Sequence, residues 1–542
     1  MPTADGSALG SINHTGFAGG YARWLRPQPP GSKAVDADFT YKRDARSTSS
    51  WLAALIAGLW LTATATGQEA ASVPDGRAAV IAIESALVDV IARAEQSVVA
   101  ISRSAPVPVP ANRAPAGIEF GRDPFERIRN NAAQPLPHAS GAGVIIDPAG
   151  LILTQYLVVR AGDVHTVSTV DGKTYAAEIR GADPHSGLAV LAVKASDLPA
   201  IAMGDATPLR KGQMVVSLSN PQAIQSDGQP TASWGIVSNL ARKAAPHDNF
   251  NNVNDPTGTF RSSIHHFGTL IQTDARLGWG ASGGALINMR GELIGLTSAV
   301  DTISGHEAAA GYAIPMNAPM RRIIDDLKQG REVEYGLLGI SFNADATAPT
   351  STGDQGVIVT QVILGSPAAR AGLQANDVIT HVGEQPVPDP DRLQLVVRYL
   401  SPSERTPVRF ERQGTPQQTE VVAGKYHVAG EKVITENPVS WRGIRVDHST
   451  AIPAFQLQQS AQLGEIDPEG CVVVSEVAED SPAWSAGVRP GMFISHVGEQ
   501  RVATPDEFHK AVESAADPVS LRFVQSARQP EGETVREIPA KL

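Results

Sequence analysis

Short apolar stretches separated by turn residues dominate the middle of the chain, from Gly141 to about Met316. Turn signals such as Asp147-Pro148-Ala149-Gly150 and Val170-Asp171-Gly172 lie between them. Many short strands bounded by such turns are typical of closed β-barrels. The region therefore predicts a pair of all-β barrels, with strands at Gly143–Ile146, Leu151–Leu153, Leu188–Val193, Met214–Leu218, Leu270–Gln272 and Leu293–Leu296.

In the segment before these strands, the apolar residues recur at a different spacing. Apolar residues at helical spacing predict an amphipathic helix over Arg77–Gln96, followed by a strand at Ser97–Ser102. The proline-rich stretch at 103–137 lacks backbone donors and predicts a mobile insert. A polar, Asn-rich stretch at His247–Thr259 predicts a surface loop, and Lys328–Glu332 predicts the end of a helix and the start of a linker.

The C-terminal third contains an internal repeat. The block Ser366-Pro367-Ala368, followed by Ala371-Gly372 and Ile379 to Gln385, recurs at Ser481-Pro482-Ala483, Ala486-Gly487 and Ile494 to Gln500. The offset is a constant 115 residues. Two copies are too few for a solenoid. The repeat therefore predicts two modules, at 330–428 and 436–542.

Composition narrows the classes of function. The 542 residues suggest three or four domains of about 150 residues each. A net charge of −11 argues against nucleic acid as a partner. The single cysteine, Cys471, lies in the apolar run Cys471–Val474 and is expected to be buried in a strand, without a disulfide. No His/Cys motif predicts a metal site, and no cofactor is expected.

One segment near the N-terminus resembles a targeting signal. Lys42, Arg43 and Arg46 precede an apolar run from Trp51 to Leu61, and Ala63-Thr64-Ala65 then offers small residues at cleavage-site spacing. We interpret 1–67 as an N-terminal extension with a signal peptide, or with an uncleaved membrane anchor at 51–65. Either reading predicts an exported protein of the periplasm or cell envelope.

A glycine-rich turn presents one serine, Ser282, within Gly278-Trp279-Gly280-Ala281-Ser282-Gly283-Gly284. Glycines allow backbone N–H groups to converge, so Gly280, Ala281 and Ser282 are candidates for an oxyanion hole beside a nucleophile. Taken alone, the same pattern is compatible with a simple tight turn.

Several motifs in order resemble the HtrA (DegP/DegS-like) family of trypsin-fold serine proteases with PDZ domains. Gly141–Thr154 is similar to that family's G-S-G-V-I-I-D-x-x-G-x-I-L-T, and Ile271–Ala275 matches I-Q-T-D-A. Further matches are Asp183-Pro184 with Leu188–Leu191, Ser219-Asn220-Pro221, and Gly235–Ser238. The resemblance implies a mostly β chain, with a trypsin-like double β-barrel over 77–329 followed by two PDZ domains.

The departures from the family pattern concern the catalytic triad. The family's histidine position is Leu157, in Thr154-Gln155-Tyr156-Leu157-Val158-Val159, and its aspartate position is Gly187. The nucleophile position keeps Ser282, with Ala281 in place of the usual asparagine. A serine hydroxyl needs an adjacent base to become a nucleophile. The resemblance therefore predicts a pseudoprotease.

An active endopeptidase with an unrecognised base is the alternative. His138, His165 and His185 are nearest in sequence to the lost positions, and His185 is expected to share a strand face with Gly187. His265 and His266 are expected on opposite faces of a strand, which is a poor arrangement for a metal.

In PDZ domains a Φ-G-Φ loop holds the C-terminal carboxylate of a peptide that adds to a sheet edge. The resemblance assigns this role to Leu338-Gly339-Ile340 and, with an arginine replacing an apolar residue, to Arg442-Gly443-Ile444. The expected partners are peptides or unfolded proteins, bound through free C-termini in protein quality control. The family also implies a homo-oligomer based on trimers, and a structural subunit of a mixed HtrA oligomer is a further alternative.

Overall fold

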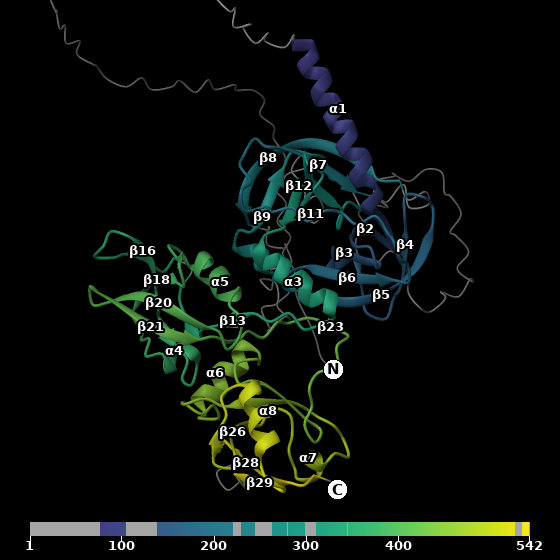
Figure 1. The fold of residues 1–542 in the computed structure, drawn as a ribbon. Coiled ribbons are helices and arrows are strands. Elements are labelled where there is room, and N and C mark those ends of the chain that lie inside the picture. Colours follow the sequence, from purple (N-terminus) through teal and green to yellow (C-terminus); the bar gives the residue numbers. More distant parts are fainter. Residues whose placement is uncertain are drawn as a thin grey trace, which may run out of the picture. The chain divides into compact units, whose positions relative to one another are not determined.

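Two β-barrels follow a long N-terminal helix (Figure 1). The computed structural model describes 76–104, 138–219, 229–243, 263–278, 280–298, 311–343, 345–525 and 534–540, with only the backbone of 138–140. These residues belong to one unit, Pro74–Leu542. The 51–65 signal or anchor, the loop at His247–Thr259 and nearly all of the 103–137 insert lie outside the described residues.

The first barrel closes because β5 pairs with β6 at the ends of the order β5-β4-β1-β2-β3-β6. A register shift between Ile179 and Gly181 bends β5 at the closure, as bulges do. Aliphatic side chains such as Ile101, Ile145 and Ile152 fill its interior. The strands are β1 (Val98–Ser104), β2 (His138–Asp147), β3 (Leu151–Gln155), β4 (Val164–Ser168), β5 (Thr174–Asp183) and β6 (Leu188–Val193).

The second barrel is closed in the order β10-β11-β12-β9-β8-β7. Helix α3 (Ala318–Gln329) follows it, between the Asn317 cap and Gly330, whose φ of +74° ends the helix. The six strand stretches expected from the sequence all fall in β2, β3, β6, β7, β9 or β11. The barrel strands are β7 (Met214–Ser219), β8 (Thr231–Arg242), β9 (Leu270–Thr273), β10 (Ala285–Asn288), β11 (Leu293–Ser298) and β12 (Gly311–Pro315).

Helix α1 (Gly76–Ala94) confirms the predicted helix, but only its C-terminal part packs against the barrels (Figure 1). Val90 and Ala94 are buried in the core shared with the second barrel. Nearer its start the apolar side chains are uncovered: Val80 is 64% exposed and Ile83 is 49% exposed. An apolar helix surface of this kind is normally covered by a partner.

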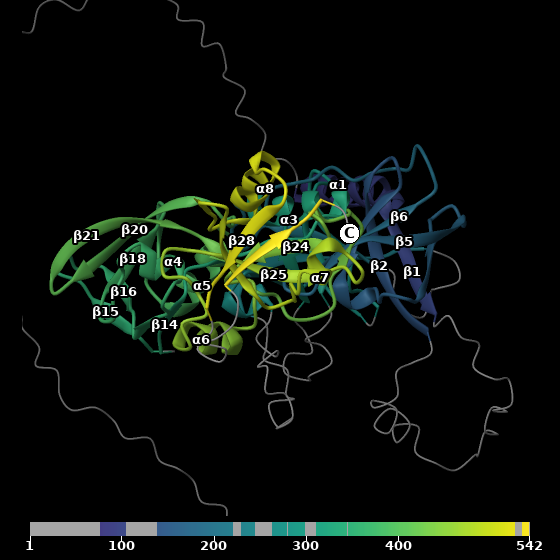
Figure 2. The same ribbon diagram turned by 90° about the horizontal axis from the view of Figure 1, so that it is seen from below.

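The first PDZ module is built on the sheet β15-β16-β18-β20-β21 (Figure 2). Two small pairings, β13 with β22 and β14 with β17, complete it. Helices α4 (Pro367–Arg370) and α5 (Pro390–Arg398) pack on it. Its strands are β13 (Gly336–Leu337), β14 (Ile340–Ser341), β15 (Thr347–Pro349), β16 (Gln355–Ile358), β17 (Gln361–Val362), β18 (Val378–Val382), β19 (Gln385–Pro386), β20 (Arg405–Arg412), β21 (Thr415–Val422) and β22 (Gly424–Lys425).

The second PDZ module repeats this plan on the sheet β24-β25-β26-β28-β29. The 115-residue offset also relates the helices. Helix α7 (Pro482–Ser485) begins 115 residues after α4, and α8 (Pro505–Ser514), past the matched block, begins 115 residues after α5. Helix α6 (Ala454–Gln462) lies between the first two strands. The strands are β24 (Ile444–His448), β25 (Val472–Val477), β26 (Phe493–Val497), β27 (Gln500–Arg501), β28 (Val519–Phe523) and β29 (Val535–Ile538). Cys471 is buried as expected, but it lies directly before β25 and not in a strand.

The segment between the two modules returns to the first barrel. Its short strand β23 (Val433–Ile434) pairs with β5 through Ala182 and Gly181. Thr435 Oγ1 donates to the Arg180 carbonyl at 2.7 Å, and the Tyr156 hydroxyl donates to the Glu431 carbonyl at 2.9 Å. The sequence did not predict this strand, because two residues carry no periodicity.

Candidate active site and peptide-binding loops

Two backbone hydrogen bonds connect the segments that carry the positions expected for the triad. The Tyr156 N–H donates to the Gly187 carbonyl at 2.8 Å, which joins the turn after β3 to the turn before β6. The Ala142 N–H donates to the Ser282 carbonyl at 2.9 Å, which joins β2 to the serine turn. Strands β2 and β3 are neighbours, so these backbone bonds connect the segments that carry Leu157, Gly187 and Ser282.

Two glycines with positive φ shape the serine turn. Gly280 and Gly283 have φ of +80° and +86°, in the left-handed region that glycine favours. The Ala281 carbonyl accepts from the Thr297 hydroxyl. Because the C=O and N–H of a trans peptide point in opposite directions, the Ser282 N–H points away from Thr297. Ser282 is 7% exposed.

The aspartate position is open. Gly187 has a φ of +68°, and the nearest atom to a Cβ built there is His265 Nε2, at 3.7 Å. His265 Nε2 lies 2.8 Å from the Ser186 carbonyl and Nδ1 lies 2.6 Å from the Thr269 hydroxyl. The carbonyl can only accept, so Nε2 donates and Nδ1 accepts. Burial lowers the pKa of His265 to about 4, which keeps this imidazole neutral.

The histidine position carries an apolar side chain that faces solvent. Leu157 belongs to the 3₁₀ helix η2 (Tyr156–Val158) and is 49% exposed. It lines a cleft of about 340 Å³ with Tyr156, Val159 and the β23 segment. A leucine can neither accept the serine proton nor orient a base.

The alternative histidines are held by other groups. His165 Nε2 accepts from the Arg160 N–H at 3.3 Å. The His185 ring packs edge-on against Tyr335, with ring centroids 4.5 Å apart, and also against Tyr426. Burial lowers the pKa of His185 well below its ordinary value. The backbone of His138 lies at the start of β2.

Two expectations about histidines were wrong. His185 and Gly187 lie in a turn, not on a strand face, because Pro184 cannot pair and the Ser186 N–H donates to Asp183 Oδ2 at 2.7 Å. His265 and His266 lie in the 3₁₀ helix η6 (Ile264–Phe267), not in a strand. The Ser263 side chain caps this helix by accepting from the His265 N–H.

A buried carboxyl beside the cleft was missed by the sequence reasoning. Asp183 accepts from the Tyr335 hydroxyl, and Tyr335 belongs to the linker that enters the first PDZ module. Burial raises the pKa of Asp183. The motif Asp183-Pro184 marked the residue, but nothing in the sequence linked it to Tyr335, 152 positions away.

The loop of the first PDZ module aims two N–H groups away from its own sheet. The Leu338 carbonyl accepts from the Ala368 N–H at 2.8 Å, and the Gly339 carbonyl accepts from the Ile363 N–H at 2.9 Å. The N–H groups of Gly339 and Ile340 therefore point to the opposite side. Strand β14 pairs only with β17 among the described residues, so its other edge is available to an added strand.

The side chains beside this loop are apolar. Leu338 packs in one cluster with Leu393, Val396 and Val397 of α5, and Ile340 and Phe342 cover the cluster from the β14 side. The side chain of a peptide's C-terminal residue would contact apolar side chains here.

The loop of the second module is closed on itself. The Ile444 N–H donates to the Trp441 carbonyl at 2.8 Å, and the Trp441 N–H donates to the Ile444 carbonyl at 2.8 Å. Arg442 and Gly443 both have positive φ, of 49° and 85°. The Arg442 guanidinium pairs with Asp517 at 2.7 Å and donates to the Ile538 carbonyl. The second loop repeats the two carbonyl bonds of the first, from the Ala483 N–H to Arg442 and from the Ala478 N–H to Gly443, but its Ile444 N–H is already used.

Comparison with known proteins agrees with this architecture. A trypsin-like peptidase domain model matches residues 141–296, and a PDZ domain model matches residues 336–422. A probable periplasmic serine endoprotease, DegP-like, from Chlamydia trachomatis is 31% identical over 409 residues, which are 74% of this chain and 74% of the relative. The chain belongs to the HtrA family.

Other HtrA proteins are similarly distant. The periplasmic serine endoprotease DegP of Salmonella typhimurium is 30% identical over 71% of this chain and 74% of its own length. A solved structure of the HtrA-type protease AlgW with decapeptide shares 25% identity and a TM-score of 0.45, over 62% of this chain and 98% of that one.

HtrA membership confirms the fold class and the compartment. The chain is mostly β, with a trypsin-like double barrel followed by PDZ domains. It is an exported protein of the periplasm or cell envelope. None of the helices in the described ranges is both long and apolar enough to cross a bilayer.

Proposed function

We propose that this HtrA homologue is a pseudoprotease that binds exposed C-termini of peptides or misfolded proteins through its first PDZ domain. The half-exposed leucine at the place of the general base carries the first part of the proposal. Losing the histidine of a serine-protease triad costs on the order of 10⁶ in kcat. The Ser282 turn then remains as a structural element, with its N–H still turned away from Thr297.

The geometry of the two PDZ loops supports the second part. Adjacent N–H groups that point away from their own sheet favour a carboxylate, and the first loop has two of them next to apolar side chains. In the second loop the N–H of Ile444 is already used by Trp441. We therefore assign C-terminus binding to Leu338, Gly339 and Ile340, and a different role to Arg442, Gly443 and Ile444.

Gly339→Ala tests this assignment, because a Cβ at Gly339 would lie 2.3 Å from Ser366 Cβ at a φ of +79°. We expect at least about tenfold weaker binding of a peptide with a free apolar C-terminus, measured by fluorescence anisotropy on the full chain. Gly443→Ala is the matched control, since it creates a similar clash in the other domain, at 2.2 Å from Ser481 Cβ. That variant should bind like the natural chain.

Amidating the peptide is the second arm of this experiment and needs no variant. It removes the carboxylate charge, so the natural chain should bind the amide at least about tenfold more weakly. Equal binding of acid and amide would refute the carboxylate loop.

We also propose self-association, as the family resemblance implies, into a trimer or a multiple of it. The uncovered apolar side chains at the start of α1 support contact between copies through this helix. The double variant Val80→Glu/Ile83→Glu should raise the concentration at which the oligomer dissociates at least about tenfold, since charge replaces apolar contact. Ser85→Glu, on the opposite side of the helix, should not.

Analytical ultracentrifugation of the full chain measures this effect. An oligomer that both variants leave unchanged would place the contact on another surface.

A further inference from the structure

The carboxylate loop of the first PDZ domain follows strand β13. The strand paired with β13 is β22, and charged groups from other segments of the chain contact it. Gly336 pairs with Lys425, and Leu337 pairs with Gly424. Leu337 is directly followed by the loop residues Leu338-Gly339-Ile340. Whatever fixes β22 therefore also fixes the base of the loop.

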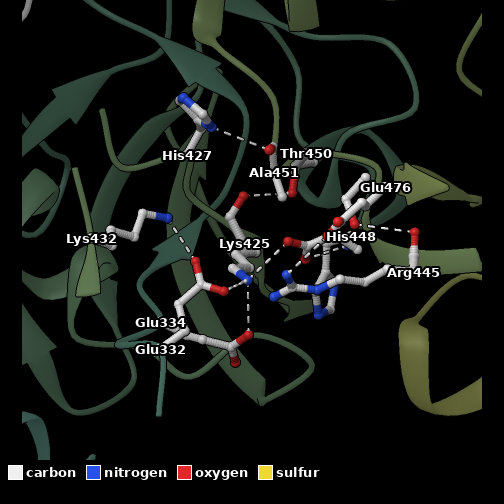
Figure 3. Close-up of polar contacts among 12 residues, drawn as sticks. Glu332, Glu334, Lys425, His427, Lys432, Arg445, His448, Thr450, Ala451 and Glu476 are labelled. Carbon is white, nitrogen blue, oxygen red and sulfur yellow. Dashed lines mark hydrogen bonds and ion pairs between the residues drawn. The ribbon is translucent and has the colours of Figure 1, made fainter. Parts of the chain in front are cut away.

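Lys425 is the centre of a charge cluster that includes the second PDZ domain (Figure 3). Its Nζ lies 2.9 Å from Glu332, 3.1 Å from Glu334 and 2.9 Å from Asp447. The two glutamates come from the linker after the protease domain, whereas Asp447 lies on β24. We call Glu332, Glu334, Lys425, Lys432 and Asp447 the Lys425 cluster.

The lysine at the centre of the Lys425 cluster is shielded from water, which strengthens its pairs, whereas Glu334 is 45% exposed. The Lys425 side chain is 6% exposed. Burial opposes its charge, yet the carboxylates of Asp447, Glu332 and Glu334 raise its pKa. Burial also opposes ionisation of Glu332, but Lys425 and Lys432 hold the pKa of this carboxyl at about 2. Thr450 of the second domain adds a hydrogen bond to the Lys425 carbonyl at 2.8 Å.

An apolar contact reaches the same loop from its other side. Leu337 and Ile363 pack against Leu457, Ala461 and Ile466 of the second domain. Ile363 is the residue whose N–H donates to the Gly339 carbonyl. The fit is close, because a Cβ at Gly365 would lie 2.7 Å from Ile466 Cγ2. Both chain segments that shape the loop thus touch the second domain.

We propose that the second PDZ domain is a positioning element for the carboxylate loop of the first, acting through Asp447 and the Leu457 face of α6. A loop held in its binding shape before the ligand arrives loses less entropy on binding. This role is consistent with the closed loop of the second domain, in which the Ile444 N–H already donates to Trp441. The inference rests on the peptide binding proposed above and adds the residues that set its strength.

The test compares three variants in the full chain. Asp447→Asn removes the charge that faces Lys425, and Leu457→Asp disrupts the apolar contact. Glu476→Gln is the matched control, because Glu476 is an exposed carboxylate of the second domain that lies 3.7 Å from Arg445 and outside the cluster. The readout is the ratio of the dissociation constants of one peptide in amidated and free-acid forms.

We expect Asp447→Asn and Leu457→Asp to reduce this ratio about five- to tenfold and Glu476→Gln to leave it unchanged. Amide hydrogen exchange at 336–340 should accelerate in the first two variants without any peptide, while unchanged protection from exchange in β26 and β28 confirms that the second domain is folded. A ratio above one in the natural chain that neither variant changes would overturn the positioning role and leave peptide binding intact. A ratio of one in the natural chain would overturn both.

Discussion

The double variant Leu157→His/Gly187→Asp is expected to cleave casein through Ser282, whereas the natural chain does not. The new histidine would stand on η2, where the family places its base, and the new aspartate would stand on the turn that binds the Tyr156 N–H. Aspartate tolerates the φ of +68° at Gly187 better than most residues. The space beside Gly187 is open to 3.7 Å, and the neighbouring His265 is neutral.

The expected gain is on the order of 10³ in kcat/KM over the natural chain. A complete triad is worth about 10⁶, and imperfect placement of two new side chains forfeits part of this. The single variant Leu157→His should recover much less, because an imidazole without its carboxylate loses about 10⁴ through the wrong tautomer.

Two controls decide between the hypotheses. Adding Ser282→Ala to the double variant must abolish cleavage, and a fluorophosphonate probe should label Ser282 in the double variant only. Strong labelling of Ser282 in the natural chain, with cleavage lost in Ser282→Ala, would instead show an active endopeptidase with an unrecognised base.

Lys425→Met is expected to lower the free energy of unfolding by about 3–5 kcal/mol. Methionine matches the lysine stem in volume, so the change removes the charge and leaves the packing. The carboxylates of Glu332, Glu334 and Asp447 would then face one another, and of the cluster's ion pairs the one between Lys432 and Glu332 would remain. Urea unfolding of the full chain, followed by tryptophan fluorescence, measures the effect.

Lys173→Met provides the comparison. Lys173 forms a pair with Asp171 at a similar 2.8 Å, but both side chains are more than half exposed, and exposed pairs contribute little. We expect no measurable change in this variant. Equal destabilisation by the two substitutions would show that the environment of Lys425 does not strengthen its pairs.

Local periodicity explains why most of the fold followed from the sequence. Barrel strands such as β6 and β11 are apolar runs between turn residues, and α3 lies between an asparagine cap and a glycine. The repeat predicted two similar modules because each motif residue has a local task, for example Ser366 and Ser481 as helix caps. These signals act within a few residues of the chain, so they are visible without the structure.

The errors arose where a local bond between a side chain and the backbone decided the conformation. The turn at Pro184–Gly187 depends on a side-chain bond from Asp183, and η6 begins at a serine cap, so apparent strand positions became turns. Neither outcome follows from hydrophobic pattern alone, since a tight turn and a strand end contain the same residue types.

By itself the sequence determined which side chains stand at the triad positions, since Leu157, Gly187 and Ser282 are identities that no fold can alter. It also determined the barrels, the modules and the family, because period and motif are local properties. Only the tertiary structure decided what the histidines contact, which PDZ loop is open and which is closed, and that Lys425 collects carboxylates from two segments. Several of these contacts join residues far apart in the chain, as Lys425 with Asp447 and Asp183 with Tyr335 do.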